Sequence, residues 1–428
     1  MERELRRSTL RARVALIGCV LVSAFGVAML DQTVVRAHEP ITTKVRFNKE
    51  VVRILQRNCL GCHRPGGIAM SLATYDEARP WAKAIKEELL EKRMPPWHAV
   101  KGYGEFRNAS ALTQRDIDLI INWVEGGAPK GDEKDLPEAS LYSNDWQLGK
   151  PDLTLKAVSE SRIAADADER RTIVLATNLK EDRWVSAIDL KPGNGSVVHC
   201  AKVYLVQTGD APAPPMTPDA PTIELRSASL LTTWMPGQKR LTWDEGTGQL
   251  LPAGSRIAVS VHYRGSGEAA TDATTIGFYF SKTTPRKIVQ EVAINNPDAV
   301  IPVASEYSPL KISFRTKTDV EAVAIRPRVS PLLVSLQATA RRPDGTEEVL
   351  IWARRYQFDW EPIYYFLRPV SLPAGTQIDV VAYFDNSDDN PKNPNDPPKA
   401  VRWSDLSSDA LCSLLVTNNT APAPSTTR

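Results

Sequence analysis

The chain has 428 residues and a formal net charge of +2, from 53 basic and 51 acidic side chains. This balance excludes the strong basic excess that is typical of nucleic-acid binding proteins, and it gives no reason to expect an acidic partner. Since domains usually contain about 100 to 200 residues, the length predicts several domains.

The first 37 residues have the pattern of an export signal. Five arginines precede an apolar run from Val14 to Leu30, and a segment of small residues ends at Ala37. A basic start, an apolar centre and a small-residue stop are typical of a signal peptide. We expect residues 1–37 to be a signal peptide cleaved after Ala37 or an uncleaved N-terminal anchor, with the rest of the protein in the periplasm or outside the cell. Later apolar runs fall short of the roughly 20 residues of a membrane span, so we expect membrane contact only through this helix.

Residues 41–137 are predicted to form a small all-α domain. Apolar side chains recur at helical spacing over residues 47–59, 74–93 and 112–129. In the last stretch, Thr113 stands three residues before Asp116, as at a helix start, and a Gly-Gly pair follows the final apolar position. We expect Trp123 to be a core residue. Residues 138–152 read as a charged, proline-containing linker.

After Trp146 the pattern changes to the alternation of β-strands. Residues 256–263 place Ile257, Val259 and Val261 on one face and His262 on the other, which predicts a half-buried strand. Residues 333–355 alternate around a Pro-Asp-Gly turn and predict a hairpin.

One internal repeat predicts the architecture of this region. LPAGSRIAVSVHY at residues 251–263 matches LPAGTQIDVVAYF at residues 372–384. A shared turn that feeds a shared strand suggests two related all-β sandwich domains, jelly-roll-like, over residues 153–283 and 284–416. Residues 417–428 are low in complexity and predicted to be a disordered tail.

The stretch RNCLGCHRPGG, residues 57–67, contains C-x-x-C-H in Cys59, Cys62 and His63. This is the attachment sequence of c-type haem. Two thiols at this spacing can bond to the vinyl groups of a porphyrin, and the adjacent imidazole then lies under the iron as proximal ligand. A zinc site requires two more Cys or His ligands, of which only His98 is near, and a redox pair requires a βαβ context. We therefore predict covalent haem c.

The distal iron ligand is predicted to be Met94. This residue ends a predicted helix, and the two prolines after it fix an extended backbone that could hold the thioether over the iron. Thioether ligation raises the reduction potential and suits electron transfer. Met70 lies only seven residues beyond His63, which leaves little chain to pass around the porphyrin. The alternatives are His98, an open site, or a core methionine at position 94.

Several stretches together resemble known families. NCLGCH, RMPPWHA, YGEFRN and LTQRDIDLIINWVEGGAPKGD resemble the small c-type cytochrome domain of some exported bacterial proteins, over roughly residues 45–137. Residues 183–200, both LPAG repeats, RRPDGTEEVL, FDW and residues 383–403 resemble the copper type II ascorbate-dependent monooxygenases, a family similar to peptidylglycine α-hydroxylating monooxygenase. The second resemblance covers most of residues 146–415.

The monooxygenase resemblance implies two β-sandwich domains with one copper each. The first copper is bound by a His-His pair and a further His, and it passes an electron. The second is bound by His-x-His and a Met, and it binds oxygen and substrate. In this chain the second set falls on Arg328, Ser330 and Leu411, and no His or Met follows His262. The second β domain therefore has no imidazole or thioether for copper, and oxygen activation is expected to be lost.

The first ligand set is partly retained. It falls on His199, Cys200 and His262, the donor set of an electron-transfer copper. Side chains of adjacent strand residues point to opposite faces, so His199 and Cys200 could both bind a metal only at a bulge. The two alternatives are a copper ion held by these three residues and partly buried histidines without a metal. An oxidising compartment also allows a disulfide between Cys200 and Cys412, although the resemblance places them across an open interdomain cleft.

The sequence favours an exported electron-transfer protein. It would carry one haem c on a β scaffold that has lost oxygen activation, and it would exchange electrons with a redox partner protein. One alternative is an active copper monooxygenase with the haem as internal donor. Another is a structural subunit of a larger assembly.

Overall fold

The computed structural model describes residues 42–138, 145–157, 160–206, 228–238, 240, 242–296, 298–327, 330–355, 360–402 and 412–418. The predicted signal or anchor, Arg328, Leu411 and residues 419–428 lie outside these ranges. Within them, no helix has the length and apolar character needed to cross a membrane.

The described residues between Phe47 and Asp135 form helices and turns. The elements are η1 (Phe47–Val51), α2 (Val52–Asn58), α3 (Tyr75–Ala78), η2 (Arg79–Trp81), α4 (Ala82–Leu90), α5 (Gln114–Glu125) and η3 (Glu133–Asp135). Thr113 caps α5 as expected, because its side chain accepts a hydrogen bond from the Asp116 N–H at 3.1 Å. Trp123 is fully buried in the core of these helices, and its indole N–H donates to the Pro129 carbonyl.

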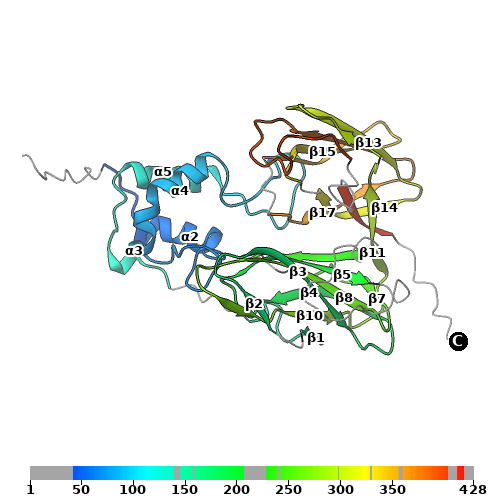
Figure 1. Ribbon diagram of the computed structural model, residues 1–428, viewed down its shortest axis with the longest axis horizontal. Helices are drawn as coiled ribbons and strands as arrows, with labels where there is room; N and C mark the ends of the chain where they lie inside the picture. The colour runs from blue at the N-terminus through cyan, green and yellow to red at the C-terminus, as the bar shows by residue number, and fades with distance from the viewer. Residues whose placement is uncertain are drawn as a thin grey trace, which may run out of the picture.

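Residues 97–108 leave the helices and pack on the second β lobe (Figure 1). The Val100 N–H donates to the Trp352 carbonyl at 2.8 Å, and the Arg107 N–H donates to the Tyr365 carbonyl at 2.9 Å. Trp97 packs against the ring of Tyr364. The prediction of a self-contained all-α unit over residues 41–137 is therefore too simple, since apolar side chains of this segment complete a β core.

The rest of the chain is mostly β, in two sandwiches. In the first lobe, two layers of strands pack face to face. One layer consists of β1 (Leu153–Lys156), β10 (Thr275–Phe280), β4 (Arg183–Lys191) and β7 (Thr247–Leu251). The other layer consists of β3 (Asp168–Ala176), β8 (Arg256–Arg264), β5 (Val198–Val206) and β6 (Ser229–Trp234). The second lobe also has two layers of strands that pack face to face. One layer consists of β11 (Lys287–Ile294), β20 (Cys412–Asn418), β14 (Val320–Pro327) and β17 (Tyr364–Leu372). The other layer consists of β13 (Ser308–Arg315), β18 (Gln377–Phe384), β15 (Leu333–Arg341) and β16 (Glu347–Arg354). Two short pairs, β2 (Ser161–Ile163) with β9 (Ala270–Asp272) and β12 (Val300–Ile301) with β19 (Val401–Arg402), complete the described strands.

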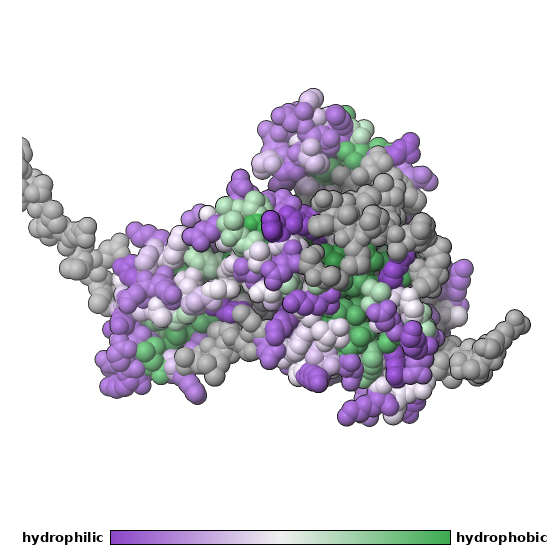
Figure 2. All heavy atoms as spheres, turned by 60° about the horizontal axis from the view of Figure 1, so that its bottom comes forward, coloured by the Kyte–Doolittle hydropathy of each residue, from purple (hydrophilic) through white to green (hydrophobic). Residues whose placement is uncertain are grey.

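A continuous sheet joins the two lobes. Strand β7 pairs in parallel with β11, with Thr247 opposite Lys287, so strands of both lobes form one eight-stranded sheet. Figure 1 shows β11 at the junction between the lobes, with the helices to one side. On the face shown in Figure 2, hydrophilic side chains cover most of the described surface, and hydrophobic ones form smaller areas between them.

The internal repeat is confirmed by equivalent turns. Gly254 and Gly375 both adopt positive φ, at 67° and 85°, where a side chain would be strained. The preceding alanine N–H donates to Asp182 at 2.8 Å in the first lobe and to Asp319 at 2.7 Å in the second. The strands that follow, β8 and β18, each pair with the matching strand of their lobe, β3 and β13.

Two expectations need correction. Strand β8 is buried on both faces, not one, because it lies between β3 and β5 and a second apolar cluster around Tyr204 covers its outer face. Strand β20 continues to Asn418, so the predicted tail begins two residues too early. The hairpin predicted over residues 333–355 is confirmed as β15 and β16.

Candidate functional site

The C-x-x-C-H loop follows directly from the C-terminus of α2. Cys59 caps the helix, and its carbonyl accepts hydrogen bonds from the backbone N–H groups of Cys62 at 3.0 Å and His63 at 2.9 Å. This single turn brings the two thiols and the imidazole onto one short, folded segment. Leu60, between the cysteines, is buried in the helical core and anchors the loop.

His63 is held by a backbone contact that fixes its tautomer. Its Nδ1 lies 3.1 Å from the Met70 carbonyl oxygen. A carbonyl can only accept, so Nδ1 carries the proton and Nε2 keeps a lone pair. Burial lowers the pKa of His63 and keeps the ring neutral. A neutral imidazole whose other nitrogen donates to a carbonyl is the usual arrangement of a metal-binding histidine.

The two thiols of the loop are partly shielded from solvent. Burial raises the pKa of Cys59 to about 12 and that of Cys62 to about 11, so both are protonated near neutral pH. The Cys62 thiol donates to the Pro236 carbonyl of the first β lobe at 3.3 Å. Two thiols that can bond to vinyl groups, followed directly by a neutral imidazole that can bind iron, are the residues that covalent haem c requires.

The two candidate thioethers are both exposed. Met94, after the end of α4, is 41% exposed, and Met70 is 43% exposed. The alternative of a core methionine at position 94 is therefore wrong. Which thioether binds the iron stays a prediction.

His98, the alternative distal ligand, packs against the second lobe. Its side chain is buried, and its Nδ1 lies 3.4 Å from the Tyr364 hydroxyl. Burial lowers the pKa of His98 to about 4. The imidazole is thus a neutral packing group of the β sandwich.

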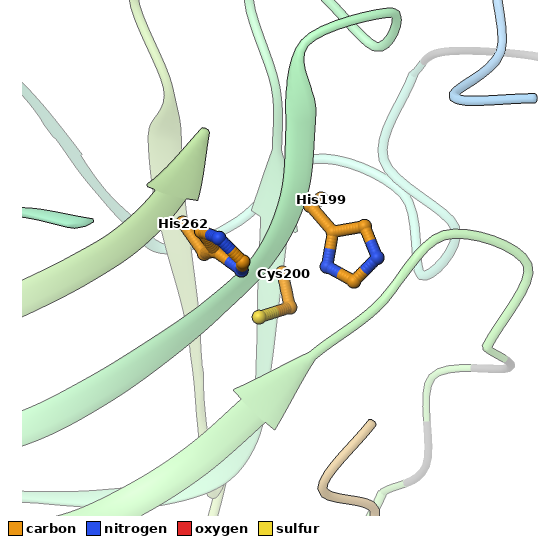
Figure 3. A group of neighbouring side chains, drawn as sticks. All are labelled: His199, Cys200 and His262. Atoms are coloured by element: carbon orange, nitrogen blue, oxygen red, sulfur yellow. The ribbon is translucent and has the colours of Figure 1, made fainter. Parts of the chain in front are cut away.

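His199, Cys200 and His262 come together in the first lobe. A β-bulge between Val198 and Cys200 shifts the register of β5 against β8. One ligand atom from each of the three side chains lies within 4.8 Å of the others, which is close enough for a shared metal ion. Figure 3 shows Cys200 between the two imidazoles. The bulge therefore removes the objection that adjacent strand residues point apart.

Polar neighbours orient the two imidazoles. His262 Nε2 lies 2.6 Å from Asp168 Oδ1 on β3, and His262 Nδ1 is buried without a hydrogen-bond partner. Arg264 Nη1 lies 3.2 Å from His199 Nε2. Burial lowers the pKa of His262, which keeps a lone pair on the ring. A buried nitrogen without a partner, on a ring oriented by a carboxylate, fits a metal ion.

The Cys200 thiol lies beside an ion pair between the lobes. Lys202 Nζ is 2.7 Å from Glu361 Oε2, and both side chains are 10% exposed. Burial raises the pKa of Cys200, whereas the nearby Arg170 and Lys202 lower it. The cavity that these side chains line has a volume of about 10 Å³. This is room for one water molecule and none for an organic substrate.

Other predicted positions lie apart from this cluster. Cys412, in β20, is fully buried and, like Cys200, forms no disulfide, so the alternative of a bond between them is wrong. Ser330 is buried, and its hydroxyl accepts from the Leu332 N–H at 3.3 Å. In the part of the chain that the structure describes, His199, Cys200 and His262 are the one group of metal-binding type.

Two residues at these sites, Asp168 and Pro236, were not predicted from the sequence. Asp168 orients His262 from a strand more than ninety residues earlier, and no motif surrounds it. Pro236 contacts Cys62 across a still longer separation. Only the register of β3 against β8, where Arg170 lies opposite His262, brings Asp168 near.

Comparisons with known proteins add little. No family model and no curated protein matches the chain. Among solved structures, it aligns with PNGF-II, with an infectious bursal disease virus Gx strain chain and with allantoicase, at 10%, 11% and 6% identity and TM-scores of 0.24, 0.19 and 0.16. The alignments cover 62%, 64% and 51% of this chain and 65%, 74% and 77% of those chains. The chain thus spans about two thirds of PNGF-II, and similarity this weak carries no inference about function.

Proposed function

We propose that the chain is an exported c-type cytochrome that transfers electrons through one covalent haem. Cys59 and Cys62 would hold the porphyrin by thioether bonds, and His63 would be the proximal iron ligand. The observation that carries the proposal is the hydrogen bond from His63 Nδ1 to the Met70 carbonyl, which leaves Nε2 for the iron. Met94 is our candidate for the distal ligand, and its exposed thioether is free of core packing.

The haem supplies a reversible one-electron couple, and the protein sets the ligands and access around it. His63 is kept neutral by burial and oriented by Met70, so it can donate its lone pair without first losing a proton. Leu60 ties the loop to the helical core. These roles suit electron transfer, in which no substrate has to bind at the iron.

The β lobes are proposed to be a scaffold similar to the copper type II ascorbate-dependent monooxygenases, without their oxygen-activating site. Residues 284–416, which supply the strands of the second lobe, contain no His or Met, and the buried Ser330 takes the place of one expected ligand. The cavity beside Cys200 is too small for an organic substrate.

A metal bound to His199, Cys200 and His262 would be a second redox centre. Two imidazoles and one thiolate are the donors of electron-transfer copper sites, and a buried thiol releases its proton when it binds a metal. The convergence of the three side chains also supports the alternative of a copper enzyme with an internal haem donor. That alternative still requires an oxygen-binding copper in the second lobe.

Metal analysis of the full chain, produced with haem-attachment machinery and loaded with copper, tests the proposal. One iron with at most one copper, and no ascorbate-dependent oxygen uptake, is the expected result. Two coppers per iron with oxygen uptake would establish the monooxygenase alternative instead. Protein without covalent haem would contradict the cytochrome assignment.

A further inference from the structure

The C-x-x-C-H loop is in backbone contact with the first β lobe. Gly61 lies against Gly237, so closely that a Cβ on Gly61 would come within 2.5 Å of the Gly237 Cα. A Cβ on Gly237 would in turn lie 3.3 Å from the Cys62 Sγ. Together with the hydrogen bond from Cys62 to the Pro236 carbonyl, these contacts fix the loop on the turn at residues 235–238.

The same turn leads directly to the metal-binding cluster. Trp234 ends β6 and lies opposite Ala201 of β5, the residue after Cys200. Trp234 and Met235 line the small cavity beside the Cys200 thiol. One end of residues 234–237 therefore contacts the Cys62 thiol. The other end lines the small cavity beside the Cys200 thiol.

We propose that residues 234–237 couple the two sites, so that electrons pass within one chain between the haem bonded to Cys62 and a copper ion held by His199, Cys200 and His262. This inference rests on the proposed function. Once the thiol hydrogen is replaced by the thioether carbon, Cys62 has no hydrogen to donate to Pro236, and the packing of Gly61 on Gly237 is the contact that holds the loop on the turn. From Pro236 the backbone runs through Met235 and Trp234 to the strand that pairs with Ala201.

The step is a simple exchange of one electron. Ferrous haem is oxidised to ferric haem, and Cu(II) is reduced to Cu(I). No bond forms or breaks, and no proton is transferred. The packed interior next to Cys200 excludes most water, which suits electron transfer between fixed centres.

Flash reduction of the haem in the anaerobic full-length holoprotein tests the coupling. We expect the ferrous haem band to decay at a rate independent of protein concentration when the cluster contains Cu(II). The same protein loaded with Zn(II), which has no redox chemistry, should lack this phase. A decay that scales with protein concentration, or that is equal in the copper and zinc forms, would overturn the proposal.

Two variants test the contact itself. Gly61→Ala pushes the loop away from Gly237 and should abolish the concentration-independent phase. Gly237→Ala disrupts the same contact from the first β lobe and leaves the haem-attachment sequence intact. It can therefore test the contact if Gly61→Ala fails to take up haem. Gly66→Asn is the matched control, since Gly66 has φ of 68°, which asparagine tolerates, and open space around a Cβ.

The possible failures are distinguishable. Absence of a covalent haem spectrum contradicts the proposed function. A haem-loaded protein that binds no copper overturns the coupling and leaves the haem assignment intact. Haem and copper spectra that are both present, with a concentration-independent phase unchanged in Gly61→Ala and Gly237→Ala, overturn the role of residues 234–237.

Discussion

His262 and Asp168 form a close pair at the cluster, with 2.6 Å between the imidazole Nε2 and the carboxylate Oδ1. The hydrogen bond from His262 lowers the pKa of Asp168 and keeps it ionised. An ionised carboxylate makes the ring a better donor at its other nitrogen. Substitution of this carboxylate therefore tests whether His199, Cys200 and His262 bind a metal ion.

Replacement of this carboxylate should weaken metal binding. Loss of such an orienting group typically costs about 10- to 100-fold in metal affinity, and we expect this range for Asp168→Asn. The affinity for Cu(I) can be measured by competition with a chelator. Asp166→Asn is the matched control, because Asp166 is an exposed carboxylate on the same segment. Equal affinities for both variants would mean that Asp168 does not support a metal ligand.

Substitution of Cys200 should change the spectrum of the bound metal. A thiolate ligand gives a sulfur-to-metal charge-transfer band with Cu(II) or Co(II), and Cys200→Ser should abolish it. Cys412→Ser is the control, since Cys412 is a buried thiol of the other lobe. A band that survives in Cys200→Ser, or is lost in Cys412→Ser, would show that Cys200 is not the ligand.

Sequence patterns were sufficient for the strand architecture. The LPAG repeat identified two related sandwiches because the turn requires glycine at positive φ in both lobes. The C-x-x-C-H spacing predicts a haem-attachment loop, and this assignment stays a prediction. Both features are local in the chain, so no knowledge of packing was needed.

Features that depend on distant packing were beyond prediction. The bulge at Val198 and Cys200 has no glycine or proline to mark it, so His199 and Cys200 were expected to point apart. Residues 97–108 have no strand alternation, yet Trp97 packs on the second lobe. The turn beside Cys62 is fixed by a contact between Gly61 and Gly237, which no periodicity encodes.

The stability of the protein should depend on His98 at acidic pH. Its folded pKa of about 4 lies below the ordinary value of about 6.5, so the unfolded chain binds more protons between these values. The contribution of a neutral His98 to the free energy of unfolding is therefore present above the unfolded pKa and is lost as the pH falls through the folded pKa. We expect the free energy of unfolding to fall by about 3 kcal/mol from this cause between about pH 7 and about pH 4.

Denaturant unfolding of the wild-type protein and of His98→Phe, measured across this pH range, isolates the contribution of His98 to the free energy of unfolding. His63 and His262 titrate in the same direction, so the relevant quantity is the difference between the two proteins. We expect the variant to lose less stability on acidification. Parallel curves would contradict a neutral, buried His98.

The distal ligand can be assigned by two matched substitutions. Met94→Ala should lower the reduction potential and open the iron to carbon monoxide, because thioether ligation raises the potential and fills the sixth position. Met70→Ala should leave both properties unchanged, and it is well matched since the two methionines are almost equally exposed. The opposite result would assign the ligand to Met70.

Covalent haem attachment tests the central claim most directly. Mass spectrometry of the denatured chain, produced with haem-attachment machinery, should show one haem added to the wild-type protein and none added to the Cys59→Ser/Cys62→Ser double variant. The Cys200→Ser/Cys412→Ser double variant should keep the added haem. A wild-type chain with no added haem, or a haem that persists without Cys59 and Cys62, would contradict the account.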